Sequence, residues 1–113
     1  MAKILVVDDE MNFTNLVKLH LGKRYKVITA NSGDDALQKA EKEHPDVITL
    51  DILMPGMNGI DVLKKLKQNR KTKNIPVILL TIADKMEKGR AFDLIHKPLD
   101  ENRLINSIER ALN

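Results

Sequence analysis

The sequence contains no cysteine and no tryptophan, and its only aromatic residues are Phe13, Tyr25 and Phe92. Without cysteine the chain can form neither disulfides nor thiolate metal sites, which fits an intracellular setting. Aromatic residues are too scarce to form a base-stacking surface for nucleic acid. No apolar run approaches the roughly 20 residues of a membrane-spanning helix. The apolar run at 4–7 is also too short for a signal peptide, and acidic residues follow it at once.

Length and charge indicate an ordinary globular domain. The chain has 113 residues, of which 42% are hydrophobic and 31% are charged. This length suffices for one domain with its own core. The net charge of +3 is too weak to indicate a nucleic-acid-binding protein. Since we find no repeat, low-complexity segment or linker, we expect residues 1–113 to form a single domain.

Short apolar runs alternate with amphipathic segments along the whole chain. We expect strands at 4–7, 25–30, 46–50, 76–81 and 94–96. We expect helices at about 10–22, 34–43 and 59–69, and a last helix that Asp100 caps. The expected inward faces of these helices are Phe13, Leu16, Val17 and Leu21; Ala36, Leu37 and Ala40; Ile60, Leu63 and Leu66; and Leu104, Ile105, Ile108 and Leu112. This alternation predicts an α/β fold in which helices cover both faces of a parallel sheet.

Four of the five predicted strands end at reactive side chains. The first is followed by Asp8 and Asp9, the third by Asp51 and the fifth by Lys97, and the fourth ends in Thr81. Because parallel strands end at the same edge of a sheet, these residues should converge where open α/β sheets bind ligands.

This set of side chains suits phosphoryl transfer. Clustered carboxylates favour a hard cation such as Mg²⁺. A carboxylate beside that ion can attack phosphorus and form an acyl phosphate. An ammonium and a hydroxyl, here from Lys97 and Thr81, would neutralise and bind the phosphoryl oxygens. Each residue taken alone also has a structural interpretation, such as a helix-dipole partner, a loop cap or a solvated charge.

At these motifs the sequence resembles the receiver domains of two-component response regulators. The matching segments are 7–10, 50–59, 76–81 and Lys97-Pro98, and the resemblance spans essentially the whole chain. It implies a flavodoxin-like, doubly wound sheet of five parallel strands in the order 2-1-3-4-5, with five helices. It also implies a phosphoprotein that accepts a phosphoryl group from a histidine kinase and then switches conformation to control an output partner.

The resemblance assigns a role to each residue of the predicted site. Asp51 would be the phosphoacceptor, with Thr81 and Lys97 binding the phosphoryl group. Asp9 would ligate Mg²⁺ directly, Asp8 more through water, and the backbone carbonyl of Leu53 would complete the ligands together with Asp51.

The resemblance also implies partners and a location. The expected partners are a sensor histidine kinase or phosphotransfer protein, which would dock on the helix at 10–22 and the loop after Pro98, and an output protein or domain. We expect no direct contact with nucleic acid or membrane, a cytoplasmic location, and no enzymatic activity beyond self-catalysed phosphotransfer and slow autodephosphorylation.

Three features depart from the family pattern. Ile82 stands where a small residue usually follows the threonine, and its side chain would hinder access to Asp51 if it pointed into the site. Leu94 replaces the aromatic residue that couples phosphorylation to output, and we do not assign that role to Phe92. The segment 82–96 has only 15 residues. We therefore expect a shortened, displaced or disordered fourth helix, with at most one or two turns at 85–88. The resulting gap would favour a homodimer.

Two alternatives stay open. One is a Mg²⁺-dependent phosphotransferase or phosphatase, and the other is a binding-only receiver that is never phosphorylated, which Ile82 and the short segment favour. We interpret the histidines as surface or boundary residues, namely His20, His44 and His96. We interpret the basic cluster around the helix at 59–69 as a solvated face.

Overall fold

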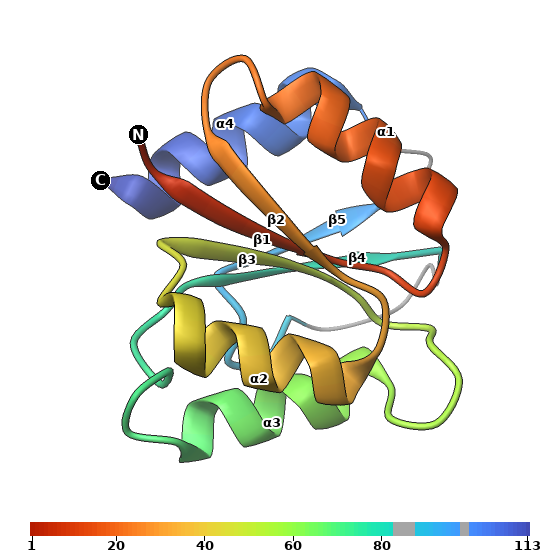
Figure 1. Cartoon of the computed structure of the whole chain (residues 1–113), viewed down its shortest axis with the longest axis vertical. Coiled ribbons are helices and arrows are strands. Elements are labelled where there is room, and N and C mark those ends of the chain that lie inside the picture. Colours follow the sequence, from red (N-terminus) through yellow and green to blue (C-terminus); the bar gives the residue numbers. More distant parts are fainter. Residues whose placement is uncertain (83–87, 98–99) are drawn as a thin grey trace.

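In the computed structural model, five parallel strands form one sheet with helices on both faces (Figure 1). The structure describes residues 1–82, 88–97 and 100–113. The strands are β1 (Lys3–Val7), β2 (Lys26–Ala30), β3 (Val47–Asp51), β4 (Val77–Thr81) and β5 (Asp93–His96). Their order, β2-β1-β3-β4-β5, confirms the predicted doubly wound topology. The helices are α1 (Met11–Leu21) and α4 (Glu101–Leu112) on one face, and α2 (Gly33–Glu43) and α3 (Gly59–Gln68) on the other.

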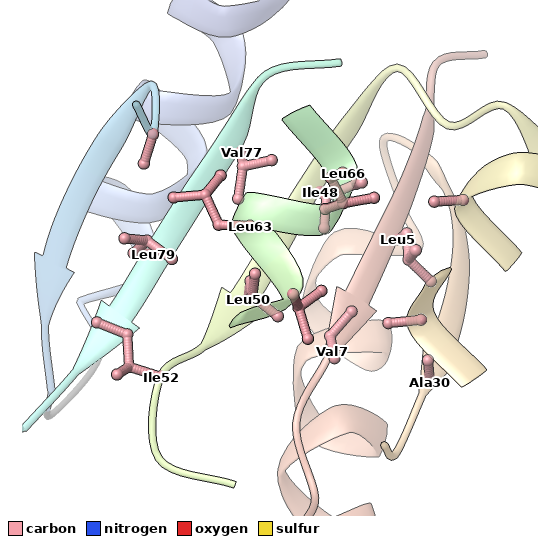
Figure 2. Packing of buried hydrophobic residues seen from close by; sticks show 14 of the residues in the cluster. Leu5, Val7, Ala30, Ile48, Leu50, Ile52, Leu63, Leu66, Val77 and Leu79 are labelled. Atoms are coloured by element: carbon pink, nitrogen blue, oxygen red, sulfur yellow. The ribbon is translucent and has the colours of Figure 1, made fainter. Parts of the chain in front are cut away.

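The three central strands are apolar on both sides because each side of the sheet faces a layer of helices. Every residue of β3 and of β4 is buried. Figure 2 shows part of the core between the sheet and the α2–α3 layer, where Leu63 and Leu66 of α3 face Leu50 and Leu79 of the sheet. A second core lies under α1 and α4. The sheet is therefore held from both sides, which fixes the positions of its strand ends.

Side chains cap α2, α3 and α4, whereas α1 begins after Glu10 without a side-chain cap. The amide of Asp35 donates to Ser32 Oγ at the start of α2, and the amide of Asp61 donates to Asn58 Oδ1 at the start of α3. The side chain of Asp100 accepts hydrogen bonds from the first turn of α4. The predicted cap at Asp100 is thus confirmed, and each cap satisfies amides that have no partner inside the helix.

Two residues that were predicted to face inward do not. Leu16 is 51% exposed and Leu112 is 36% exposed. Helix α1 instead buries Thr14 and Val17, so Leu16 lies to one side of the face that packs on the sheet. Conversely, Val62 of α3 is fully buried although the predicted inward face omitted it.

The connection between β4 and β5 is only partly described. Of the helical turns predicted at 85–88, residues 85–87 lie outside the described residues, and Lys88 is not helical. Gly89 then adopts a positive φ of 53°, and the amide of Phe92 donates to the carbonyl of Val77 at 2.7 Å as the chain enters β5. The described ranges contain four helices rather than the five that the resemblance implies. None of these four is long and apolar enough to cross a membrane.

Gly59 lies where α3 starts, in direct contact with the end of β3. A Cβ atom at this position would come within 2.4 Å of the carbonyl oxygen of Asp51 and 2.7 Å of the Cα of Ile52. The amide of Gly59 also donates to the carbonyl of Ile52 at 2.8 Å. This close approach of two backbones requires glycine, and it holds the loop after β3 against the strand end.

We expect Gly59→Ala to destabilise the protein by about 1–3 kcal/mol, because the added methyl group would displace backbone that cannot yield cheaply. Without that clash, alanine in a helix would stabilise by about 0.5–1 kcal/mol, so the sign of the change is diagnostic. Urea unfolding measures it, with Gln68→Ala at the exposed end of α3 as the control. A stabilised Gly59→Ala variant would contradict the close approach.

Asp93, at the start of β5, joins that strand to α4. Its carboxylate accepts hydrogen bonds from Arg103 at 2.8 and 3.2 Å, from Ser107 at 2.7 Å and from Arg110 at 2.9 Å. Burial acts to raise the pKa of Asp93, but the hydrogen bonds from Arg103, Ser107 and the Leu94 amide outweigh it and hold the pKa well below its usual range.

This depressed pKa predicts an acid-sensitive contribution to stability. Since the folded pKa lies below the unfolded value of about 3.9, the contribution is complete above that value and is lost as the pH falls through the folded pKa. At pH 7 we expect Asp93→Asn to lower the free energy of unfolding by about 1–3 kcal/mol. The difference from wild type should shrink below about pH 4. Unfolding curves between pH 3 and 7 test this, with the exposed Asp34→Asn as control, and a difference independent of pH would refute it.

Candidate functional site

The register of the sheet brings the predicted site residues to one edge. Asp51 pairs with Leu80, the residue before Thr81, and Thr81 pairs with His96, the residue before Lys97. Asp8 directly follows the last residue of β1. The strand ends therefore converge as the sequence predicted, at the end of the sheet toward which β5 points in Figure 1.

The ammonium group of Lys97 lies between two buried carboxylates. Its Nζ is 3.1 Å from Asp8 Oδ2 and 3.3 Å from Asp51 Oδ1. Asp8 is only 2% exposed and Asp51 only 6%. Asp8 also accepts a hydrogen bond from the amide of Glu10 at 2.9 Å. Two acids thus share one base in a compact, largely desolvated group.

The electrostatics of this group follow from burial and from the neighbouring charges. Burial raises the pKa of Asp51, and the nearby negative charge of Asp8 raises it further, against the opposing effect of Lys97. For Lys97 burial acts to lower the pKa, but the hydrogen bond to Asp8 and the charges of both carboxylates outweigh it, so the pKa is raised. The lysine is therefore held in its charged form, while the negative charges of the acids are only partly compensated.

A third carboxylate, that of Asp9, lies beside this group and makes it suited to binding a cation. One oxygen from each of Asp8, Asp9 and Asp51 lies within 4.8 Å of the others. Asp9 is exposed, so the cluster opens to solvent on that side. All three are hard oxygen donors, which Mg²⁺ prefers, and that ion commonly keeps several of its waters. The donor set therefore fits a divalent cation.

The other residues of the predicted site lie at the ends of β3 and β4. Thr81 is fully buried, and its carbonyl oxygen accepts a hydrogen bond from the amide of Lys97 at 2.7 Å. Leu53 follows β3 by two residues, and its side chain is 56% exposed. The roles predicted for the Thr81 hydroxyl and for the Leu53 carbonyl remain predictions.

The structure also places the residues that depart from the family pattern. Ile82 is 64% exposed, so its side chain is not buried within the site. Leu94 is half-buried and packs against the core under α3. Phe92 precedes β5, at the opposite end of that strand from Lys97. Phe92 therefore does not supply the aromatic ring that Leu94 replaces, in agreement with the sequence analysis.

One contact of the site was not predicted. The ring of Phe13, in the first turns of α1, lies 4.4 Å from Lys97 Nζ. Such a cation–π contact stabilises an ammonium that has lost part of its water. The sequence placed Phe13 correctly toward the sheet, but no spacing rule links a helix residue to a lysine more than 80 positions away. The histidines, by contrast, are all exposed as predicted.

The comparisons with known proteins agree with this site. The model of the response regulator receiver domain matches residues 4–109. The alkaline phosphatase synthesis transcriptional regulatory protein PhoP of Bacillus subtilis is 45% identical over 118 residues, covering 97% of this chain and 48% of that protein. The chain spans between 24% and 48% of the first curated relatives that it matches.

Solved structures show the same architecture. Chemotaxis protein CheY4 of Vibrio cholerae superposes with a TM-score of 0.91 at 34% identity, covering 99% of each chain. Response regulator protein TrrA of Thermotoga maritima, solved in complex with Mg²⁺ and BeF, superposes with a TM-score of 0.89 at 32% identity, covering 99% of this chain and 100% of that one.

The raised pKa of Asp51 predicts that its ionised carboxylate lowers the stability of the folded protein. A carboxyl group whose pKa is higher in the folded than in the unfolded state makes the folded protein less stable as the pH rises from the unfolded pKa to the folded pKa. In a buffer with chelator at pH 7, we expect Asp51→Asn to be more stable than wild type by about 1 kcal/mol. Urea unfolding measures this, with the exposed Asp61→Asn as control. A less stable Asp51→Asn would show that the ion pair with Lys97 outweighs burial.

Proposed function

The chain belongs to the response regulator receiver family, whose members are phosphoacceptor domains of two-component signalling, and we propose from this premise that Asp51 receives the phosphoryl group. One observation carries the assignment to this residue. Asp8 and Asp51 are both buried beside Lys97, but only Asp51 ends the central strand β3, between the end of β1, which Asp8 follows, and the end of β4, where Thr81 lies. On this proposal residues 1–113 form one receiver domain.

The side chains divide the chemistry among them. An oxygen of Asp51 attacks the phosphorus of the donor, the bond from phosphorus to the donor group breaks, and an acyl phosphate results. Lys97, which already lies 3.3 Å from Asp51 Oδ1, pairs with the negative oxygens of the transferred group. The hydroxyl of Thr81 donates a hydrogen bond to one of these oxygens and moves toward them on activation.

The acidic cluster holds the cofactor in this proposal. Asp9 would ligate Mg²⁺ directly and Asp8 mainly through water, and Asp51 and the carbonyl of Leu53 would complete the protein ligands. When bound, the ion offsets negative charge on the phosphoryl oxygens. Asp8 keeps its contact with Lys97, so the ammonium remains oriented toward Asp51.

The proposed phosphoryl donor is a sensor histidine kinase or a phosphotransfer protein that docks on α1. Three large apolar side chains are exposed on this helix, namely Met11 at 63%, Leu16 at 51% and Leu19 at 69%. Exposed apolar groups of this kind suit contact with another protein. The loop after Pro98, which completes the predicted docking surface, lies partly outside the described residues. The domain acts in the cytoplasm, and its catalysis is limited to its own phosphorylation and slow dephosphorylation.

Intact-mass measurement after incubation with acetyl phosphate and Mg²⁺ tests the assignment. We expect wild type to gain the mass of one phosphoryl group and Asp51→Asn to gain none. Asp61→Asn, which removes an exposed acid from α3, should be labelled like wild type. Labelling of Asp51→Asn would refute the assignment. No labelling of wild type, while a receiver known to be active is labelled in parallel, would support the binding-only alternative.

Lys97→Met and chelation test the supporting groups in the same assay. Removing a preorganised charge that stabilises a transferring phosphoryl group typically slows such reactions by about 10²–10³-fold. We expect a loss of at least about tenfold in the labelling rate for Lys97→Met. Chelator should abolish labelling of wild type. An unchanged rate in either case would contradict the role of that group.

A further inference from the structure

The positive charge of this protein is concentrated on one flank. Segment 59–76, which contains α3 and the turn after it, has six basic residues and one acidic residue, a net charge of +5. The rest of the chain has 13 basic and 15 acidic residues, a net charge of −2. The overall charge of +3 therefore hides a basic flank on an otherwise slightly acidic molecule.

A hollow of about 450 Å³ lies on this flank, between α3 and the loop that leads into β5. It is within the range of ligand-binding pockets. Its lining residues are Ile60, Leu63, Lys64, Lys67, Gln68, Lys88, Gly89 and Arg90. Most of the lining surface is apolar, because the two aliphatic side chains and the methylene groups of the long side chains form it. From the sequence alone, the basic cluster is interpreted as a solvated helix face. Such a face would not by itself form a hollow with an apolar floor and cationic groups on both walls.

The cations around this hollow lack compensating charges within the described part of the chain. No salt bridge there involves Lys64, Lys88 or Arg90. Lys67 differs from these three residues because its Nζ donates hydrogen bonds to the carbonyls of Lys73 at 3.1 Å and Ile75 at 2.9 Å. Burial and then the charge of Arg90 lower the pKa of Lys67, which indicates like charges held close together.

We propose that the hollow between α3 and residues 88–90 is a docking surface for an acidic amphipathic helix of a protein partner. The leucine-type side chains of such a helix would fill the apolar floor, and its carboxylates would pair with Lys64, Lys88 and Arg90. Helix α3 has ten residues, or about 15 Å, so a partner helix of about three turns would match its length. This surface lies apart from the acidic cluster, and the proposal does not depend on phosphorylation of Asp51.

Two observations favour a peptide over nucleic acid. None of the lining residues is aromatic, so the hollow offers no stacking platform for bases. Its floor is also apolar, which favours the contacts of a helix laid in a groove, in which side chains at spacings of three and four anchor the partner.

Titration of the whole chain with a designed acidic peptide tests the proposal. The peptide is a helix of glutamate and leucine with leucines on one face, and a scrambled peptide of the same composition is its control. We expect NMR shift changes centred on Ile60, Lys64 and residues 88–90, and binding at least tenfold tighter than that of the scrambled peptide. Shift changes centred on another face, or equal binding of both peptides, would overturn the proposal.

Charge reversal separates this site from general attraction to a basic protein. Lys64→Glu combined with Arg90→Glu should weaken binding at least tenfold. Lys23→Glu combined with Lys42→Glu makes the same change in net charge at exposed sites elsewhere and should weaken it much less. Equal losses in the two double variants would overturn the proposal. So would tighter, Lys64- and Arg90-dependent binding to a single-stranded oligonucleotide or to vesicles containing phosphatidylserine.

Discussion

The ion pair of Lys97 with Asp8 and Asp51 is the interaction on which the site depends. Two carboxylates this deeply buried repel each other, and an ammonium 3.1 and 3.3 Å away offsets that repulsion without removing it. The remaining negative charge is what makes the cluster receptive to a cation. The same negative charge opposes folding, because the site holds charges that the core would otherwise exclude. The apolar clusters on both faces of the sheet offset this cost.

Much of the fold and of the site could be predicted because both follow from simple periodicities. Apolar runs set the strands, and their parallel arrangement sends every strand end to one edge, so Asp8, Asp51 and Lys97 meet without any further information. The carboxylates, the lysine and Thr81 were identified from the residue type at each strand end. The cap at Asp100 was predictable because a side-chain acceptor before an amphipathic run has a direct local role.

The sequence predictions are wrong or incomplete where tertiary contacts determine which residues are buried or lie together. Leu16 lies beside the buried face of α1 rather than on it, and only the crossing of the helix over the sheet determines which neighbour is buried. The contact of Phe13 with Lys97 joins residues whose proximity depends on how α1 lies over the carboxyl edge of the sheet. The hydrogen bonds between Asp93 and α4 likewise join the start of a strand to a helix, and no spacing pattern in the sequence predicts that the two are connected.

The site residues come from strands whose order in space differs from their order in the chain. Asp8 and Lys97 are separated by 89 positions but touch across the sheet. No fragment that lacks β1 or the segment after β5 can assemble both charges beside Asp51. Anything that binds all of them recognises only the folded chain and shifts the folding equilibrium toward it, by an amount that grows with the logarithm of its concentration. The form with an occupied site therefore unfolds less often and presents less open chain to proteases.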